Sequence, residues 1–155
     1  MKESKQMKDV VISIIGTQTL DETDRPDVIE LVTDGQYSHS PEETVLTYQE
    51  SELTGLEGTS TRFTIGPQDV VMSREGKMST RMVFEEGKKH LFLYETPYGA
   101  ATMGVNTNKV THHMGEHGGE MEIDYVVDFD HTVVGRNNFK ISVKEVKKDD
   151  VRCQI

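Results

Sequence analysis

The stretch from Arg74 to Val105 constrains the fold of this chain most strongly. It reads REGKMSTRMVFEEGKKHLFLYETPYGAATMGV. Apolar and polar residues alternate in two segments that flank a glycine turn, and a Thr-Pro-Tyr-Gly corner then leads into a third segment. Successive side chains of a strand point to opposite faces of a sheet, so a period of two is typical of strands that are buried on one face. The stretch predicts three consecutive antiparallel strands.

β-branched side chains dominate the composition. The chain has 17 Val, 8 Ile and 16 Thr but only 2 Ala and 7 Leu, a bias that favours pleated sheet over helix. Its 155 residues suit one domain, because domains most often have about 100 to 150 residues. We therefore expect a single all-β domain over residues 1–155, with the core at about 7–146 and a polar tail at 147–155.

The same alternation recurs along the chain and predicts about ten short strands. The predicted strands are 7–18, 28–37, 44–53, 62–65, 69–74, 77–84, 90–96, 100–108 with its continuation 109–114, 120–130 and 139–146. The connections have hairpin length, and one glycine turn is expected at Gly135. A single closed antiparallel β-barrel of about eight to ten strands is preferred over a sandwich, because closure leaves no exposed strand edge. Tyr98, at the corner, is expected to cover one end of this barrel.

The formal net charge of −10 argues against two classes of partner. Nucleic acid and anionic membrane surfaces are bound through Lys and Arg, so we expect neither as a partner. One basic cluster is interpreted as a solvated tail, because it lies beside Asp149 and Asp150 and consists of Lys144, Lys147, Lys148 and Arg152. The single cysteine, Cys153, allows no internal disulfide and indicates a reducing compartment. No apolar run approaches the ~20 residues of a membrane-spanning helix and no signal peptide is recognisable, so a cytoplasmic location is expected.

The segment from His113 to His117 matches the H-x-x-E-H pattern of some zinc enzymes, with His112 beside it. That pattern binds zinc only where a helix brings both histidines to one face. Here Gly115 lies inside the segment and two more glycines follow it, which favours a hairpin turn between strands. We interpret the segment as a turn with exposed histidines, and metal binding is the alternative.

Three segments resemble a known family. They read VLTYQESELTGLEGTSTRFTI, VVMSREGKMSTRMVFEEGKKHLFLYETPYGAATMGVNT and GGEMEIDYVVDF. In this order they resemble the YwiB-like family of uncharacterised bacterial proteins, a domain of unknown function with a calycin-like β-barrel. The resemblance covers about Met7 to Val146 and is most specific at Glu95 to Gly99. It implies a calycin-like or lipocalin-like barrel but no reaction, and the Gly-x-Trp signature of lipocalins is absent because the chain has no tryptophan.

A second group of residues forms a candidate ligand site. On one strand Tyr48 would share its face with Glu50 and Glu52, which would bring both carboxylates to the lumen or to an open end of the barrel. Carboxylate, guanidinium and phenol groups can orient a polar or anionic head group, and methionines adapt to an apolar part. The candidate contacts are Tyr48, Glu50, Arg74, Met82 and Tyr125. The alternative is a structural ion pair between Glu50 and Arg74 above a packed core.

No arrangement of residues in the sequence indicates an enzyme. The spacings yield no Ser/His/Asp set, no phosphate-binding glycine loop and no dinucleotide fingerprint. We therefore expect a non-enzymatic barrel without a cofactor that binds a small amphipathic molecule in or at the mouth of its lumen. The alternative is a packed barrel that acts as a protein-interaction or homodimer module through its outer face.

Overall fold

The computed structural model describes residues 7–19, 25–52, 56–76, 79–96 and 98–146, and these residues form ten strands. Their bounds are β1 Lys8–Thr19, β2 Asp27–His39, β3 Thr44–Gln49, β4 Ser60–Ile65, β5 Val70–Glu75, β6 Thr80–Phe84, β7 Lys89–Thr96, β8 Gly99–Gly115, β9 Gly118–Phe129 and β10 Thr132–Glu145. Cys153 and three residues of the basic cluster, Lys147, Lys148 and Arg152, lie outside the described residues, whereas Lys144 belongs to β10. No helix in the described part of the chain is long and apolar enough to cross a membrane.

The ten strands belong to one antiparallel sheet that curls into a barrel. Its order is β6-β5-β4-β3-β2-β1-β10-β9-β8-β7. Strands that are adjacent in the sheet are therefore consecutive in the chain, except β1 and β10. The two ends of this order, β6 and β7, are consecutive in the chain and lie against each other. The barrel is thus nearly closed, which confirms the all-β barrel predicted from the sequence.

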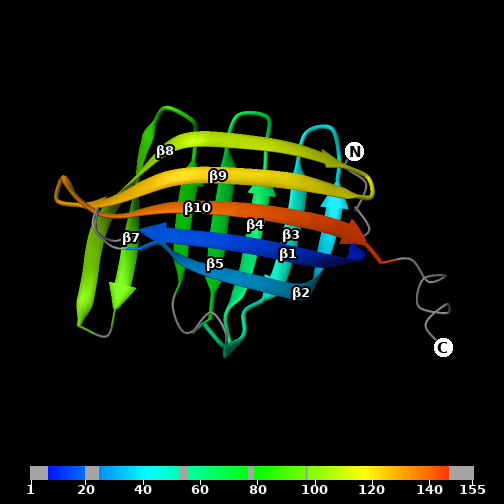
Figure 1. Ribbon diagram of the computed structural model, residues 1–155, viewed down its shortest axis with the longest axis horizontal. Coiled ribbons are helices and arrows are strands. Elements are labelled where there is room, and N and C mark those ends of the chain that lie inside the picture. Colours follow the sequence, from blue (N-terminus) through cyan, green and yellow to red (C-terminus); the bar gives the residue numbers. More distant parts are fainter. Residues whose placement is uncertain (1–6, 20–24, 53–55, 77–78, 97, 147–155) are drawn as a thin grey trace, which may run out of the picture.

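The barrel is flattened into two layers whose strands cross (Figure 1). The front layer contains β8, β9, β10, β1 and β2, and β3 to β7 run behind it. The long strands β2 and β8 contribute to both layers. β2 pairs with β1 over 27–37 and with β3 only over 35–39, while β8 pairs with β7 over 99–106 and with β9 over 103–115. Such shared strands form the corners of orthogonally packed sheets.

The core lies between the two layers and follows from the alternation along each strand. The largest fully buried apolar side chains are Tyr37, Phe63, Phe84, Ile12, Leu46, Met72 and Ile123. Tyr125 stacks in the core between two rings, with centroids 4.8 Å from Phe84 and 5.7 Å from Phe139.

The turn before β10 differs from the sequence prediction. Gly135 does not form a turn but lies within β10, beside a β-bulge between Val133 and Gly135. The reversal is made by Asp130 and His131, whose φ angles of 51° and 66° are both positive. Two consecutive positive φ angles are typical of a type I′ hairpin, and Asp tolerates this conformation better than most residues. Gly135 therefore accompanies the bulge in β10 and not the turn.

Two other predictions, about the end of β3 and the corner at Tyr98, were wrong. β3 ends at Gln49, so the strand alternation does not extend to Glu52. Tyr98 does not cover the barrel end, because its side chain is 99% exposed. The segments 100–108 and 109–114 form a single strand, with an irregularity in pairing between Thr107 and Lys109.

Candidate functional site

Two adjoining cavities lie inside the barrel, toward the end where β1 finishes and β10 begins. Their volumes are about 480 Å³ and about 320 Å³. Both are lined by Gln18, Leu56, Arg74, Tyr125 and Asn137. Because these five residues are common to both cavities, we treat them as two lobes of one hollow.

All five residues predicted as ligand contacts line this hollow. Tyr48 and Glu50 line the smaller lobe, Met82 lines the larger lobe, and Arg74 and Tyr125 line both. The strand register brings three of the elements together, since Thr61 of β4 pairs with Tyr48 of β3 on one side and with Arg74 of β5 on the other. Paired residues of antiparallel strands point to the same face.

A buried ion pair connects two of these residues. Arg74 Nε lies 3.7 Å from Glu50 Oε2, and the exposed fractions of the two side chains are 27% and 1%. Thr61 Oγ1 accepts a hydrogen bond of 3.3 Å from Arg74 Nε and donates one to Glu50 Oε2. Glu52, in contrast, is exposed. The hollow therefore contains one carboxylate of the predicted pair, and that carboxylate is held by Arg74 and Thr61.

The two tyrosines of the hollow present protonated hydroxyl groups. Burial raises the pKa of Tyr48, and the neighbouring Glu50 carboxylate raises it further. Burial raises the pKa of Tyr125 to about 12, although the positive charge of Arg74 acts in the opposite direction. At neutral pH both phenols are therefore hydrogen-bond donors as well as acceptors.

The remaining walls of the hollow are mainly apolar. The larger lobe adds Phe92, Met103, Val127 and Val134, and the smaller lobe adds Ile14, Leu31, Phe63, Phe139 and Ile141. The sequence prediction missed Leu56, Gln18 and Asn137. The predicted last strand begins at Phe139 and so leaves out Asn137, which lies in β10. Leu56 precedes β4, in a connection without alternation.

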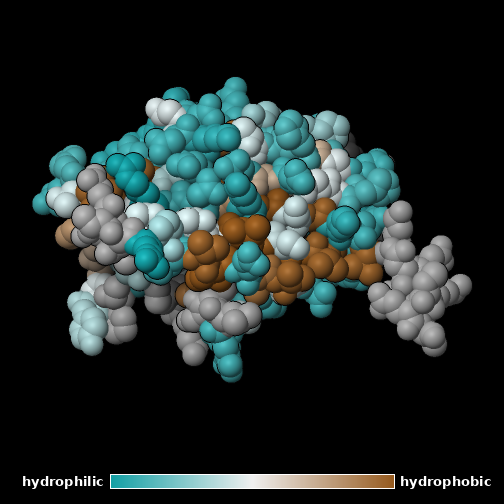
Figure 2. All heavy atoms as spheres, viewed as in Figure 1, coloured by the Kyte–Doolittle hydropathy of each residue, from teal (hydrophilic) through white to brown (hydrophobic). Residues whose placement is uncertain are grey.

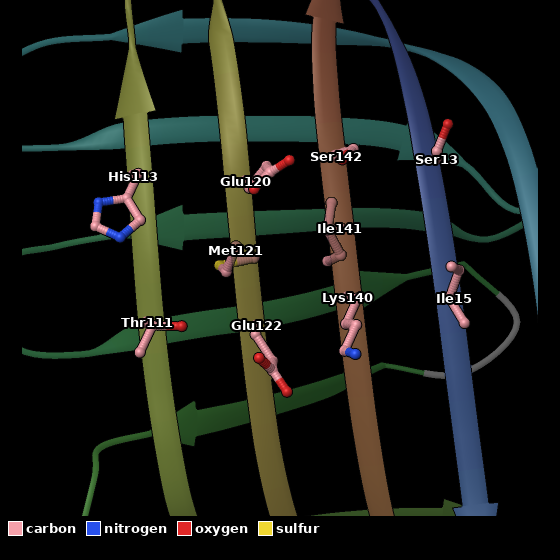
Figure 3. Close-up of a pocket in the computed structure, with 10 residues that line it drawn as sticks. All are labelled: Ser13, Ile15, Thr111, His113, Glu120, Met121, Glu122, Lys140, Ile141 and Ser142. Carbon is pink, nitrogen blue, oxygen red and sulfur yellow. The ribbon is translucent and has the colours of Figure 1, made fainter.

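A separate shallow depression of about 320 Å³ lies on the outer face of the front layer (Figure 3). It spans four neighbouring strands and is bordered mainly by polar side chains, namely Ser13, Thr111, His113, Glu120, Glu122, Lys140 and Ser142. None of the five predicted contacts borders it. A polar depression on an open sheet face lacks the apolar walls typical of small-molecule sites, so the hollow is the better candidate.

The H-x-x-E-H segment forms a strand end and a turn. His112 and His113 belong to β8, and His117 lies in the turn between β8 and β9. His117 Nδ1 is 3.1 Å from Glu145 Oε2. Among the residues that the structure describes, no group of three or more His, Cys, Asp and Glu side chains is placed to hold a metal ion. The geometry matches a hairpin with exposed histidines rather than a zinc helix.

Comparison with known proteins gives a family and a fold but no activity. No curated protein matches the chain. The crystal structure of the ywiB protein from Bacillus subtilis is similar, with a TM-score of 0.79 and 19% sequence identity over 92% of this chain and 95% of that one. At this identity the likeness establishes the barrel fold alone. A family model described as "Domain of unknown function (DUF1934)" matches residues 12–141. The chain therefore belongs to the DUF1934 family, a YwiB-like domain of unknown function.

Proposed function

We propose that this protein is a non-enzymatic carrier or sensor that binds a small amphipathic molecule in the hollow. The polar or anionic head group would lie at Arg74, and the apolar part would lie against the methionines and aromatic rings. One observation carries the proposal: a partly exposed guanidinium borders both lobes of a largely apolar hollow.

Arg74 retains donors for a ligand. Both of its contacts in the described part of the chain use Nε, which faces Glu50 and Thr61. Neither terminal nitrogen takes part in a hydrogen bond or ion pair with a described residue. A guanidinium presents five N–H donors in a planar fork, so the outer edge can bind a carboxylate or sulfate while Nε remains on Glu50. The phenol of Tyr125, which borders both lobes, can supply a further hydrogen bond.

The walls suit an apolar chain of variable shape. Met82 and Met103 face the larger lobe, and unbranched thioether side chains adapt to irregular ligands. The same composition supports binding rather than catalysis. The residues that line the two lobes include no His, Cys, Ser or Lys. Of their two carboxylates, Asp27 is exposed at the rim, and the buried Glu50 is tied to Arg74 and Thr61. A general base or nucleophile needs a group that is free to react.

Native mass spectrometry of the freshly purified protein tests this proposal, by comparison with the denatured mass. We expect a co-purified small molecule, or uptake of added decanoate or decyl sulfate at one molecule per chain. Two matched variants locate the site. Leu56→Trp places a large side chain where both lobes meet and should abolish uptake, whereas Leu91→Trp, at a side chain that is 69% exposed, should leave uptake unchanged. A bare mass with every probe, or equal uptake by both variants, would overturn the proposal.

A further inference from the structure

The first half of β2 is an open strand edge. Residues 27–34 pair with β1 on one side, and pairing with β3 begins only at Gly35. The described part of the chain contains no other backbone hydrogen bond to residues 27–34. In Figure 1 this half of β2 borders the front layer. Among the described residues, the outer N–H and C=O groups of residues 27–33 therefore have no strand partner, which is the arrangement that accepts an added strand.

The side chains of this edge strand are unusually apolar for an exposed position. Val28, Ile29 and Val32 are 58%, 52% and 69% exposed. On the neighbouring strand Ile15 is 42% exposed, and it shares the outer face with β2. Figure 2 shows the resulting band of apolar atoms over β1 and β2. Sheet edges are commonly protected by charged or inward-turned residues, and here large apolar groups remain in contact with water.

Acidic residues alternate with the apolar ones on the outer face. Side chains on one face of a strand are two positions apart, so the outer row of β2 consists of Val28, Glu30, Val32 and Asp34. Asp27 lies at the start of the strand on the opposite face, where it borders the smaller lobe of the hollow. None of these three carboxylates forms an ion pair with a residue that the structure describes. The edge therefore presents exposed apolar side chains together with carboxylates that form no ion pair with a described residue.

We infer that this β2 edge, residues 27–34, binds an extended peptide segment of another protein in which apolar and basic residues alternate on one face. The added strand would hydrogen-bond to the free edge. Its apolar side chains would lie beside Val28 and Val32, and its Lys or Arg side chains beside Glu30 and Asp34, since directly opposite residues in neighbouring strands are in contact. A second copy of this chain fits poorly, because it would add a second set of carboxylates and no cation to this edge, in a protein of net charge −10. The inference does not depend on a ligand in the hollow.

A synthetic peptide tests the inference on the intact protein. The probe is the eight-residue peptide Lys-Thr-Val-Thr-Lys-Thr-Val-Thr. Lysine and valine alternate along one face of this peptide, and threonine occupies the other face. Amide hydrogen exchange followed by NMR should show new protection within residues 27–34 when the peptide is added. A peptide with glutamate in place of lysine should give none, and neither should the lysine peptide N-methylated at every residue, because no N–H then remains on either backbone edge.

Charge reversal provides the matched protein variants. Glu30→Lys should weaken the lysine peptide about fivefold, the size expected when an opposite-charge cross-strand pair becomes a like-charge pair. Glu120→Lys makes the same change on the outer face of β9, three strands away in the order of the sheet, and should leave binding unchanged. Protection absent from residues 27–34, or equal weakening by both variants, would overturn the inference. A dimer in light scattering that Val32→Lys dissociates would overturn it as well, because the edge would then bind a second copy.

Discussion

Arg74 Nε lies 3.7 Å from Glu50 Oε2, yet 27% of the arginine side chain reaches solvent while only 1% of the glutamate does. Glu50 is therefore the residue whose burial depends more strongly on the ion pair. Burying a carboxylate to this depth is costly unless neighbouring groups pair with it, and Arg74 and Thr61 both contact Glu50.

The first prediction concerns this pair. Arg74→Met should lower the free energy of unfolding by about 2 to 3 kcal/mol, because it removes the cation that pairs with the buried carboxylate of Glu50. Glu50→Gln combined with Arg74→Met should recover at least half of that loss, since no buried charge remains. Urea unfolding of the two single variants and the double variant completes the cycle. If the losses of free energy in the two single variants add up to the loss in the double variant, the two groups do not interact.

The second prediction uses a buried hydroxyl without a partner. Thr107 Oγ1 is buried and forms no hydrogen bond in the described structure. Thr107→Val replaces it with a methyl group of similar shape, and should raise the free energy of unfolding by about 1 kcal/mol. Thr61→Val is the matched control and should lower it by about 2 kcal/mol, because the Thr61 hydroxyl donates to Glu50. Similar losses in both variants would contradict the assignment of Thr107.

The third prediction concerns the point at which β2 passes from one layer to the other. A Cβ at Gly35 would contact the Cδ1 atom of Ile12 and would lie 2.6 Å from the carbonyl oxygen of Thr47. Gly35→Ala should therefore destabilise the protein by about 1 to 3 kcal/mol, the usual cost of overpacking. Gly115→Ala adds a Cβ whose nearest contact is 3.8 Å away and should be close to neutral. Thermal unfolding compares the two, and equal midpoints would show that the corner has room.

The fourth prediction is a dependence on alkaline pH. Burial raises the pKa of Tyr37 and Tyr125 from 10.0 to about 12. The folded state therefore keeps these protons at a pH where the unfolded state has lost them, and stability falls as the pH rises from 10 to about 12. Below pH 10 this contribution is fully present. Tyr125→Phe should reduce the slope by up to about 1.4 kcal/mol per pH unit, measured by urea unfolding at several pH values. An unchanged slope would place the Tyr125 hydroxyl in water.

Much of the fold and part of the site follow from local pattern. Alternation alone assigns the inward faces of β3, β5 and β9, and therefore places Tyr48, Arg74 and Tyr125 toward the same interior. It cannot place Thr61 between Tyr48 and Arg74, because that contact depends on the register of three strands. It also fails beyond Gln49, where the strand ends and Glu52 turns to solvent.

Two features could not be predicted because they arise from geometry between strands. The turn at Asp130 and His131 has no glycine, and the glycine that follows serves a bulge instead. The open edge of β2 contradicts the expectation that closure protects every strand. It results from the crossing of the two layers, which separates residues 27–34 from β3, and no local pattern records such a separation.

Methyl NMR of the protein labelled at its methionine methyl groups tests the central proposal most directly. Met82 and Met103 line the larger lobe, whereas Met7 lies elsewhere and is 39% exposed. On titration with decanoate we expect saturable shifts of the Met82 and Met103 methyl signals, with intermolecular Overhauser effects to the decanoate chain, and no change at Met7. Leu56→Trp should abolish these effects. Unshifted Met82 and Met103 signals at decanoate concentrations that saturate other carrier proteins, or effects confined to Met7, would contradict a ligand-binding hollow.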